Sequence, residues 1–199
     1  MRVICLDLEG VLVPEIWESL AVKTKISELK LTTRDIKNYD ELMSHRLKII
    51  NDKKLKISDI LGVVESLVPF KGALEFLNKL SKDYQVLILS DTFYEISYPL
   101  IAKLNFPNVF CHHLSIGQQG DILGYKLRLN NQKKATVKAF QSLNFEVFAA
   151  GDSYNDLDML RTANLGVLYM APQLLLKEYP HFLTASNYED LYSILSGDL

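Results

Sequence analysis

Short runs of apolar residues alternate with helical patterns along most of the chain. We interpret five of them as buried strands: Val3–Leu8, Gln85–Ser90, Val109–His112, Val147–Ala150 and Leu165–Met170. Most of these runs are continuously apolar, as is typical of parallel sheets that are covered on both faces. The pattern therefore predicts an α/β fold with a Rossmann-like, doubly wound parallel sheet. The run Gly117-Gln118-Gln119-Gly120 separates two mixed segments, which indicates a hairpin within His113–Arg128.

About fifty residues after the first strand depart from this rhythm and contain helical patterns without a convincing strand. Asn38 and Glu41 have the spacing of a capping box, which predicts a helix that ends near Asn51. Residues 57–67 carry a second apolar stripe, which Pro69 closes. We expect a small helical cap beside the sheet. The predicted division is an α/β core of residues 1–14 and 69–199 and a cap of residues 15–68.

Composition excludes several kinds of protein. The chain has 199 residues, of which 48% are hydrophobic and 23% charged, so it is not a disordered protein. Its 22 basic and 24 acidic residues leave no basic excess with which to bind nucleic acid or an anionic membrane. No apolar run reaches the ~18–20 residues that span a bilayer, and two cysteines cannot form a disulfide framework. We expect a cytoplasmic protein without nucleic-acid or membrane partners.

Acidic loops follow three of the predicted strands. They are Asp7-Leu8-Glu9-Gly10-Val11, Ser90-Asp91-Thr92 and the segment Gly151–Asp156. Each carboxylate taken singly could be a helix cap. In a doubly wound sheet, however, the carboxyl ends of the strands meet at one crevice. Several carboxylates there repel one another unless a cation neutralises them, and oxygen ligands suit a hard ion such as Mg²⁺.

Together these loops resemble the motifs of the haloacid dehalogenase-like phosphohydrolases. Asp7-Leu8-Glu9-Gly10-Val11 matches the nucleophile motif, Ser90 the second motif, Lys133 the third, and Gly151–Asp156 the metal motif. The helical insert matches the cap of one branch. The similarity runs nearly from end to end, and it is greatest to the branch of phosphoserine phosphatases that also move phosphate onto homoserine. The resemblance therefore implies Mg²⁺ as cofactor and phosphoserine, with homoserine as a second partner, as small-molecule substrates.

The resemblance implies a role for each residue of the first and last motifs. Asp7 would attack phosphorus and form an aspartyl-phosphate. Glu9 would protonate the leaving alkoxide and then deprotonate the attacking water. Mg²⁺ would be held by Asp7, the backbone carbonyl of Glu9 and Asp152, and Asp156 would orient metal-bound water. Strand alternation places Glu9 on the same side as Asp7 if the strand stays extended.

Other residues are candidates for substrate contacts. Ser90 and Lys133 would neutralise the phosphoryl oxygens; the resemblance favours Lys133 over the adjacent Lys134 because it places the lysine immediately before a helix. Glu15 would pair with a substrate ammonium, although a solvated carboxylate at a helix start fits the same pattern. Asp91 and Asn155 are further candidates, with a helix cap and a turn residue as the respective alternatives.

Arg46 falls on the apolar stripe of the helix predicted over Tyr39–Ile50, where Leu42, Met43 and Ile50 lie three or four residues away. A guanidinium there must either extend to water or meet an anion, because an unpaired buried charge is costly. The resemblance supplies an arginine at the matching position of the cap. We therefore expect Arg46 to bind the substrate carboxylate.

Position 9 and the two adjacent histidines add detail to this picture, and other substrates and one other class of protein fit part of it. Position 9 carries Glu where the superfamily more often has Asp, which changes the reach of the carboxyl but hardly its acidity. The alternative substrates are a nucleotide or phosphoglycolate, and the alternative class is a receiver-like regulatory module. The adjacent His112 and His113 point to opposite faces of a strand, so they cannot chelate one metal ion together.

Overall fold

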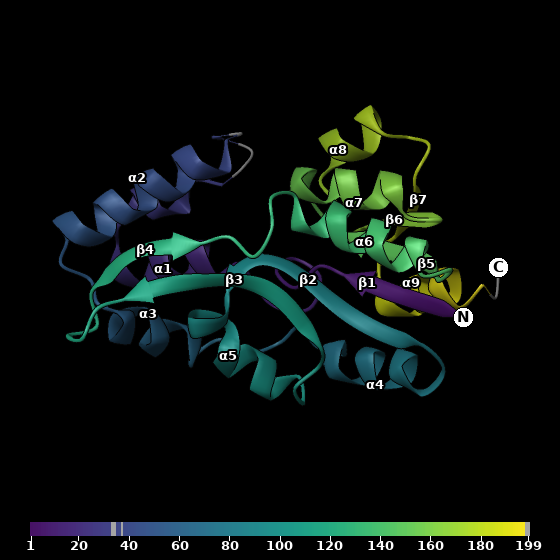
Figure 1. Ribbon diagram of the computed structural model, residues 1–199, viewed down its shortest axis with the longest axis horizontal. Helices are drawn as coiled ribbons and strands as arrows, with labels where there is room; N and C mark the ends of the chain where they lie inside the picture. Colours follow the sequence, from purple (N-terminus) through teal and green to yellow (C-terminus); the bar gives the residue numbers. More distant parts are fainter. Residues whose placement is uncertain (33–34, 37, 198–199) are drawn as a thin grey trace.

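The computed structural model describes residues 1–32, 35–36 and 38–197. Within these residues its centre is one seven-stranded sheet of order β4-β3-β2-β1-β5-β6-β7 (Figure 1). All neighbouring strands are parallel except the antiparallel pair β3 and β4. The strands are β1 (Arg2–Leu6), β2 (Gln85–Phe93), β3 (Val109–Ile116), β4 (Ile122–Lys126), β5 (Glu146–Gly151), β6 (Leu165–Tyr169) and β7 (Leu183–Ala185).

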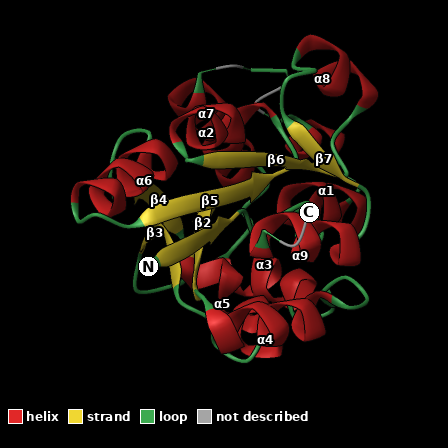
Figure 2. Ribbon diagram, turned by 90° about the vertical axis from the view of Figure 1, so that its right-hand side faces the viewer, coloured by secondary structure: helices red, strands yellow, loops and turns green. Residues whose placement is uncertain are grey.

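Helices cover both faces of the sheet (Figure 2). Successive residues of β1 therefore enter different cores: Ile4 and Leu6 join one apolar cluster, whereas Val3 and Cys5 join the other. This two-sided burial explains why the strand is apolar at every position. The α-helices are α1 (Ile16–Thr24), α2 (Tyr39–Asp52), α3 (Ile57–Val64), α4 (Ala73–Asp83), α5 (Tyr94–Lys103), α6 (Gln132–Ser142), α7 (Leu157–Thr162), α8 (Gln173–Glu178) and α9 (Tyr188–Ser196).

The predicted fold class is confirmed, and the five predicted strands and the hairpin are present. β2 and β3 are each three or four residues longer than the apolar runs suggested, and β7 was not predicted. The extension of β3 makes the hairpin with β4, whose tip contains the predicted glycine-flanked turn, with Gly117 N–H and Asp121 O 2.8 Å apart. Within the described residues, no helix has the length and apolar character needed to cross a bilayer.

The helices of residues 15–68 group around this hairpin at one end of the sheet (Figure 1). α2 begins where expected, because Asn38 Oδ1 accepts hydrogen bonds from the N–H groups of Asp40 and Glu41 at 2.9 and 3.1 Å. The start of α3 meets the hairpin tip, where Ile57 N–H donates to Gly120 O at 2.9 Å. This arrangement brings the first residue of α2 to the carboxyl end of β2, since Tyr39 Oη donates to the backbone oxygen of Asp91 at 2.8 Å.

Candidate active site

The three acidic loops meet at the carboxyl end of the central strands. β1 lies between β2 and β5, so the loops that follow these strands are neighbours, and Asp7 N–H donates to Ala150 O at 3.0 Å. A cavity of about 230 Å³, here called the inner cavity, opens at this point. Eight of the residues predicted for the site line it: Asp7, Glu9, Glu15, Arg46, Ser90, Asp91, Asp152 and Asn155.

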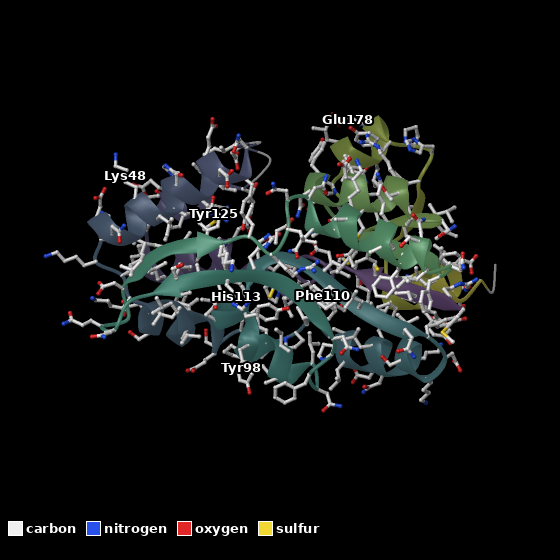
Figure 3. The ribbon with its side chains drawn as sticks, in the orientation of Figure 1. Lys48, Tyr98, Phe110, His113, Tyr125 and Glu178 are labelled. Carbon is white, nitrogen blue, oxygen red and sulfur yellow. The ribbon has the colours of Figure 1, made fainter. Side chains whose placement is uncertain are left out.

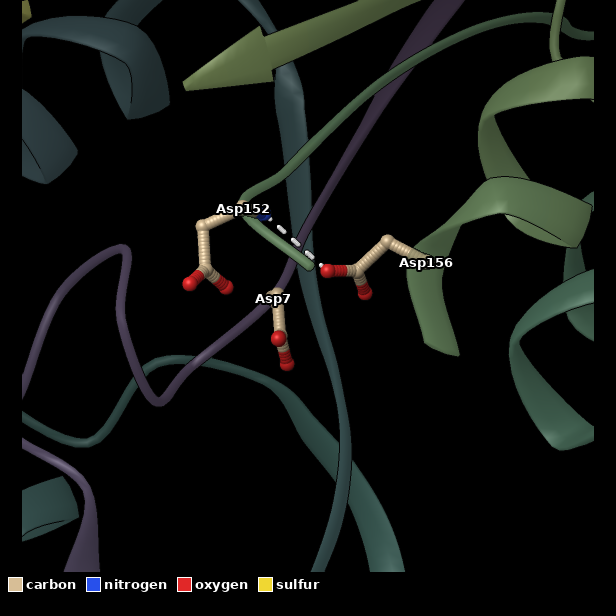
Figure 4. A group of neighbouring side chains, drawn as sticks. All are labelled: Asp7, Asp152 and Asp156. Atoms are coloured by element: carbon tan, nitrogen blue, oxygen red, sulfur yellow. Dashed lines mark hydrogen bonds between the residues drawn. The ribbon is translucent and has the colours of Figure 1, made fainter. Parts of the chain in front are cut away.

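Three buried aspartates form a compact cluster beside the inner cavity (Figure 4). One carboxylate oxygen from each of Asp7, Asp152 and Asp156 lies within 4.8 Å of the others. Asp156 is fully buried, and its Oδ2 accepts the N–H groups of Asp152 and Ser153 at 3.0 and 3.1 Å. Its Oδ1 accepts a hydrogen bond from Lys133 Nζ at 2.7 Å. Asp156 thus uses both oxygens to hold the loop and the lysine.

Lys133 supplies the cation at the centre of this cluster. Its side chain is 2% exposed, and Nζ lies 2.9 Å from Asp7 Oδ1 and 3.9 Å from Asp91 Oδ2. Burial alone would lower the pKa of Lys133, but Asp156, Asp7 and Asp91 outweigh it and raise that pKa well above its usual range. Lys134 is over a third exposed and reaches Asp158 at 3.3 Å instead. Of the two lysines, Lys133 is the one in contact with the aspartate cluster.

The donor set fits a divalent cation. Burial, followed by repulsion from Asp156, raises the pKa of Asp7 well above its usual range even though Lys133 opposes the change. One ammonium therefore does not neutralise three carboxylates, and a hard divalent ion such as Mg²⁺ would. The backbone also allows close approach here, because Gly10 has φ +78° and a Cβ on it would collide with the Asp152 carboxylate.

Glu9 reaches the inner cavity by a different route from the one predicted. β1 ends at Leu6, so strand alternation does not place Glu9. Instead, its Oε1 accepts a hydrogen bond from the N–H of Ile16, the first residue of α1, at 2.7 Å. Burial, with repulsion from Glu15 second, raises the pKa of Glu9 to about 8. The carboxyl group is therefore largely protonated at neutral pH, as a general acid must be.

Arg46 lines the same cavity and brings a positive charge to it. It is 6% exposed, its guanidinium carbon lies 4.5 Å from the centre of the Trp17 ring, and Nη2 donates to Leu31 O at 2.8 Å. Its Nε is buried and has no hydrogen-bond partner among the described residues. Burial lowers the pKa of Arg46 to about 10, so the group stays charged at neutral pH. Glu15, the residue immediately before α1, lies on the cavity wall as well.

Ser90 and Asp91 lie in the last part of β2, where its register with β3 shifts between Leu89 and Phe93, and not in a loop as the sequence suggested. Ser90 is 1% exposed, and Asp91 accepts a hydrogen bond on Oδ2 from Asn155 Nδ2 at 3.2 Å. Burial opposes ionisation of Asp91, but Lys133, His112 and Asn155 lower its pKa below the usual range. Asp91 and Asn155 also line a larger adjoining cavity of about 920 Å³, here called the outer cavity, and Tyr39 borders both.

Several residues near the site were not predicted, among them four that contact or adjoin the predicted ones. Trp17 and Tyr39 line the inner cavity, and the buried His112 and Gln132 lie behind Asp91. Tyr39, His112 and Gln132 reach Asp91 from 52, 21 and 41 positions away in the chain. No local motif in the sequence signals such contacts.

Comparisons with known proteins agree with this geometry. The model of the haloacid dehalogenase-like hydrolase family matches residues 14–161. A phosphoserine phosphatase of Pseudomonas aeruginosa (ThrH) is 51% identical over 191 residues, which are 96% of this chain and 93% of that protein. A phosphoserine phosphatase of Pseudomonas syringae is 47% identical and is covered to 81% of its length by 96% of this chain.

A solved structure has the same fold. The crystal structure of a phosphoserine phosphatase in its apo form superposes with a TM-score of 0.77 at 20% identity, and the match covers 98% of this chain and 97% of that one. The family model covers most of the chain, and the two curated relatives extend along nearly all of it. The chain therefore belongs to the haloacid dehalogenase-like hydrolase family.

Proposed function

We propose that the protein is a Mg²⁺-dependent phosphatase that hydrolyses O-phospho-L-serine through an aspartyl-phosphate on Asp7. The main support for this choice of substrate is the inner cavity, which Arg46 and Glu15 line together with Asp7. A guanidinium suits the carboxylate of phosphoserine, and a carboxylate suits its ammonium. The names of the two Pseudomonas relatives support the same substrate.

The first half-reaction uses Asp7 and Glu9. Asp7 Oδ1 is held by Lys133 Nζ and by Leu8 N–H at 2.8 Å, so we assign Oδ2 to the attack on phosphorus. A bond forms between Asp7 Oδ2 and phosphorus while the bond from phosphorus to the serine oxygen breaks. Glu9 gives its proton to the departing alkoxide, and serine leaves as the neutral alcohol.

The second half-reaction reverses the role of Glu9. The Glu9 carboxylate takes a proton from a water molecule as its oxygen bonds to phosphorus, and the bond to Asp7 breaks to release phosphate. Lys133, buried against Asp7, and Ser90, on the cavity wall, would hold the phosphoryl oxygens throughout. Because Glu9 ends protonated and Asp7 free, the enzyme returns to its starting state.

The metal ion would be held by Asp7, Asp152 and the backbone carbonyl of Glu9, with Asp156 keeping the Asp152 loop in place. When bound, Mg²⁺ would supply positive charge that offsets the carboxylates and the phosphoryl oxygens. We propose that the helices of residues 15–68 act as the specificity cap, since Glu15 and Arg46 both come from them.

The other substrates fit the inner cavity less well. Phosphoglycolate has no ammonium for Glu15, and a nucleotide has no carboxylate for Arg46. A receiver-like regulatory module is not supported, because the chain belongs to a hydrolase family. The test is a phosphate-release assay with equal concentrations of phosphoserine, phosphoglycolate and nucleoside monophosphates. Phosphoserine should give the highest kcat/KM, and the proposal fails if it ranks no better than the others.

We also propose that homoserine can replace water in the second half-reaction. Its hydroxyl oxygen would bond to phosphorus as Glu9 removes the hydroxyl proton, while the bond from phosphorus to Asp7 Oδ2 breaks and leaves the Asp7 carboxylate free. The outer cavity supports this step, because it adjoins the inner one at Tyr39, Asp91 and Asn155 and gives an alcohol a route to Asp7. Phosphorus NMR of a mixture of phosphoserine and homoserine should show a new phosphomonoester beside phosphate. Phosphate alone would exclude the transfer.

A further inference from the structure

The Asp91 carboxylate has a placement that direct phosphate binding does not explain. It lies on the wall of the inner cavity and adjoins Lys133, yet it is itself an anion that would repel a phosphoryl group. Its oxygens are directed to protein donors: Oδ2 accepts from Asn155 Nδ2 at 3.2 Å, and Oδ1 lies 3.5 Å from His112 Nε2. We therefore expect Asp91 to orient neighbouring side chains and not to bind the phosphate itself.

His112 is fixed as the donor toward Asp91. The ring is 3% exposed, and its Nδ1 lies 3.1 Å from the backbone nitrogen of Arg128, whose N–H donates to it. An imidazole that accepts on Nδ1 carries its proton on Nε2. That proton faces Asp91 Oδ1. The ring also packs edge-on against Tyr39, with the ring centres 5.8 Å apart, so it cannot turn freely.

Asn155 is held at both ends of its side-chain amide. Asp91 accepts a hydrogen bond from Nδ2, and Ser153 Oγ donates to Oδ1. An amide that donates on one side and accepts on the other has only one orientation that satisfies both partners. Nδ2 has a second N–H, and Asn155 lines the inner cavity. Ser153, Asn155, Asp91 and His112 thus form a row of linked side chains. Within this row, the second N–H of Asn155 is the donor that can bind a phosphoryl oxygen.

Gln132 holds the backbone of the same end of β2. Its Nε2 donates to the backbone oxygen of Ser90 at 2.5 Å, and its Oε1 accepts from Arg128 Nε at 2.9 Å. Gln132 also precedes Lys133, so the contact links the phosphate-binding serine to the start of α6. Gln132 Nε2 also lies 3.4 Å from Asp91 Oδ1, so Gln132 and His112 together hold the Asp91 carboxylate on which the orientation of Asn155 depends.

We infer that His112 and Asp91 are positioning residues that hold the Asn155 amide with an N–H directed at the phosphoryl group. This inference rests on the proposed function and assigns His112 and Asp91 an effect on phosphate through Asn155. Without the donor on His112, Asp91 Oδ1 would keep only the contact with Gln132 Nε2 at 3.4 Å among the described residues, and the carboxylate could turn toward Lys133. Asn155 could then rotate its amide and present Oδ1, an acceptor, to the phosphate.

The test is the binding of inorganic phosphate, the product, in the presence of Mg²⁺, measured by isothermal titration calorimetry. His112→Phe keeps a ring but loses the donor, and it should raise the Kd for phosphate about tenfold, the effect of one misdirected hydrogen bond. His112→Gln can return a donor near the position of Nε2 and should restore Kd to within about threefold of the wild type. His113→Phe is the matched control on the exposed neighbour, whose side chain is 56% exposed (Figure 3), and it should change nothing.

A double-mutant cycle separates positioning from a merely structural role. In an Asn155→Ala background, His112→Phe should weaken phosphate binding no further, because the group it positions is absent. Multiplied losses in the double variant would overturn the inference, as would a failure of His112→Gln to restore binding. If His112→Phe does not fold, Asp91→Ala in the same cycle carries the same expectation, since Asp91 is partly exposed. Hydrolysis of phosphoserine by the wild type is assayed separately, so failure of the proposed function is distinguished from failure of this inference.

Discussion

Replacing Arg46 by alanine tests the substrate assignment most directly. Within the described residues the guanidinium contacts the Trp17 ring at 4.5 Å, Leu31 O at 2.8 Å and Met43 Sδ at 3.8 Å. Its buried Nε has no partner among the described residues, and Nη2 has a second N–H beyond the one that Leu31 accepts. These two groups can bind a carboxylate side by side.

The magnitude follows from what alanine removes. Loss of one partner of a desolvated, hydrogen-bonded charge pair costs about 2–5 kcal/mol, which is about 30-fold to several thousandfold in kcat/KM. The contacts of the charged guanidinium to Trp17 and to Leu31 O are worth about 0.5–2 and about 1.5–3 kcal/mol respectively, and they act on folding. Arg46→Ala should therefore reduce kcat/KM for phosphoserine by far more than kcat/KM for p-nitrophenyl phosphate, which has no carboxylate.

The assay compares both substrates in the wild type, Arg46→Ala and Arg46→Met, which retains more of the packing against Trp17. Lys48→Met removes a cation from an exposed position of the same helix (Figure 3) and serves as the matched control. Thermal unfolding of each variant reports the structural share of the effect. Equal losses on the two substrates would refute carboxylate recognition and leave Arg46 as a structural residue of the cap helices.

Three other substitutions test the catalytic cluster. Asp7→Asn should abolish turnover with little change in circular dichroism, because it keeps the shape and removes the nucleophile; measurable turnover would contradict the mechanism. Asp152→Asn should weaken Mg²⁺ binding about tenfold or more in a calorimetric titration, and an unchanged affinity would exclude Asp152 as a ligand. Gly10→Ala should lower the free energy of unfolding by about 1–3 kcal/mol, since φ is +78° and the new Cβ meets Asp152; a stability equal to the wild type would show that the loop can move aside.

The central sheet could be predicted because each of its buried strands is recognisable from its own residues. Strands buried on both faces must be apolar at nearly every position, so β1 and β5 stand out in the sequence. The loops after them were recognised for the opposite reason, since clustered carboxylates have no place in a core without a partner. β7 was missed because it has three residues, two of them exposed, and so carries almost no apolar signal.

The support of the site could not be predicted in the same way. The sequence placed His112 and His113 on opposite faces of a strand, and in the structure the His112 side chain is buried while that of His113 is exposed. Its contact with Asp91 depends on β3 lying beside β2, with Phe93 opposite His112 in the register. Spacing within one strand states which face a residue occupies, but the neighbour on that face is set by the order of strands. The order of strands in a sheet cannot be predicted from the residues of a single segment.

The structure suggests a reason why position 9 carries Glu where the superfamily more often has Asp. The sequence showed only that the carboxyl lies one methylene farther out than Asp would place it, by about 1.5 Å. In the structure that reach lets Oε1 accept the first N–H of α1 at 2.7 Å. The proposed acid is thereby attached to the helix that follows Glu15, the candidate for the substrate ammonium. Because recognition and proton transfer then share one helix end, a substrate that shifts α1 also shifts the carboxyl that must protonate its leaving oxygen.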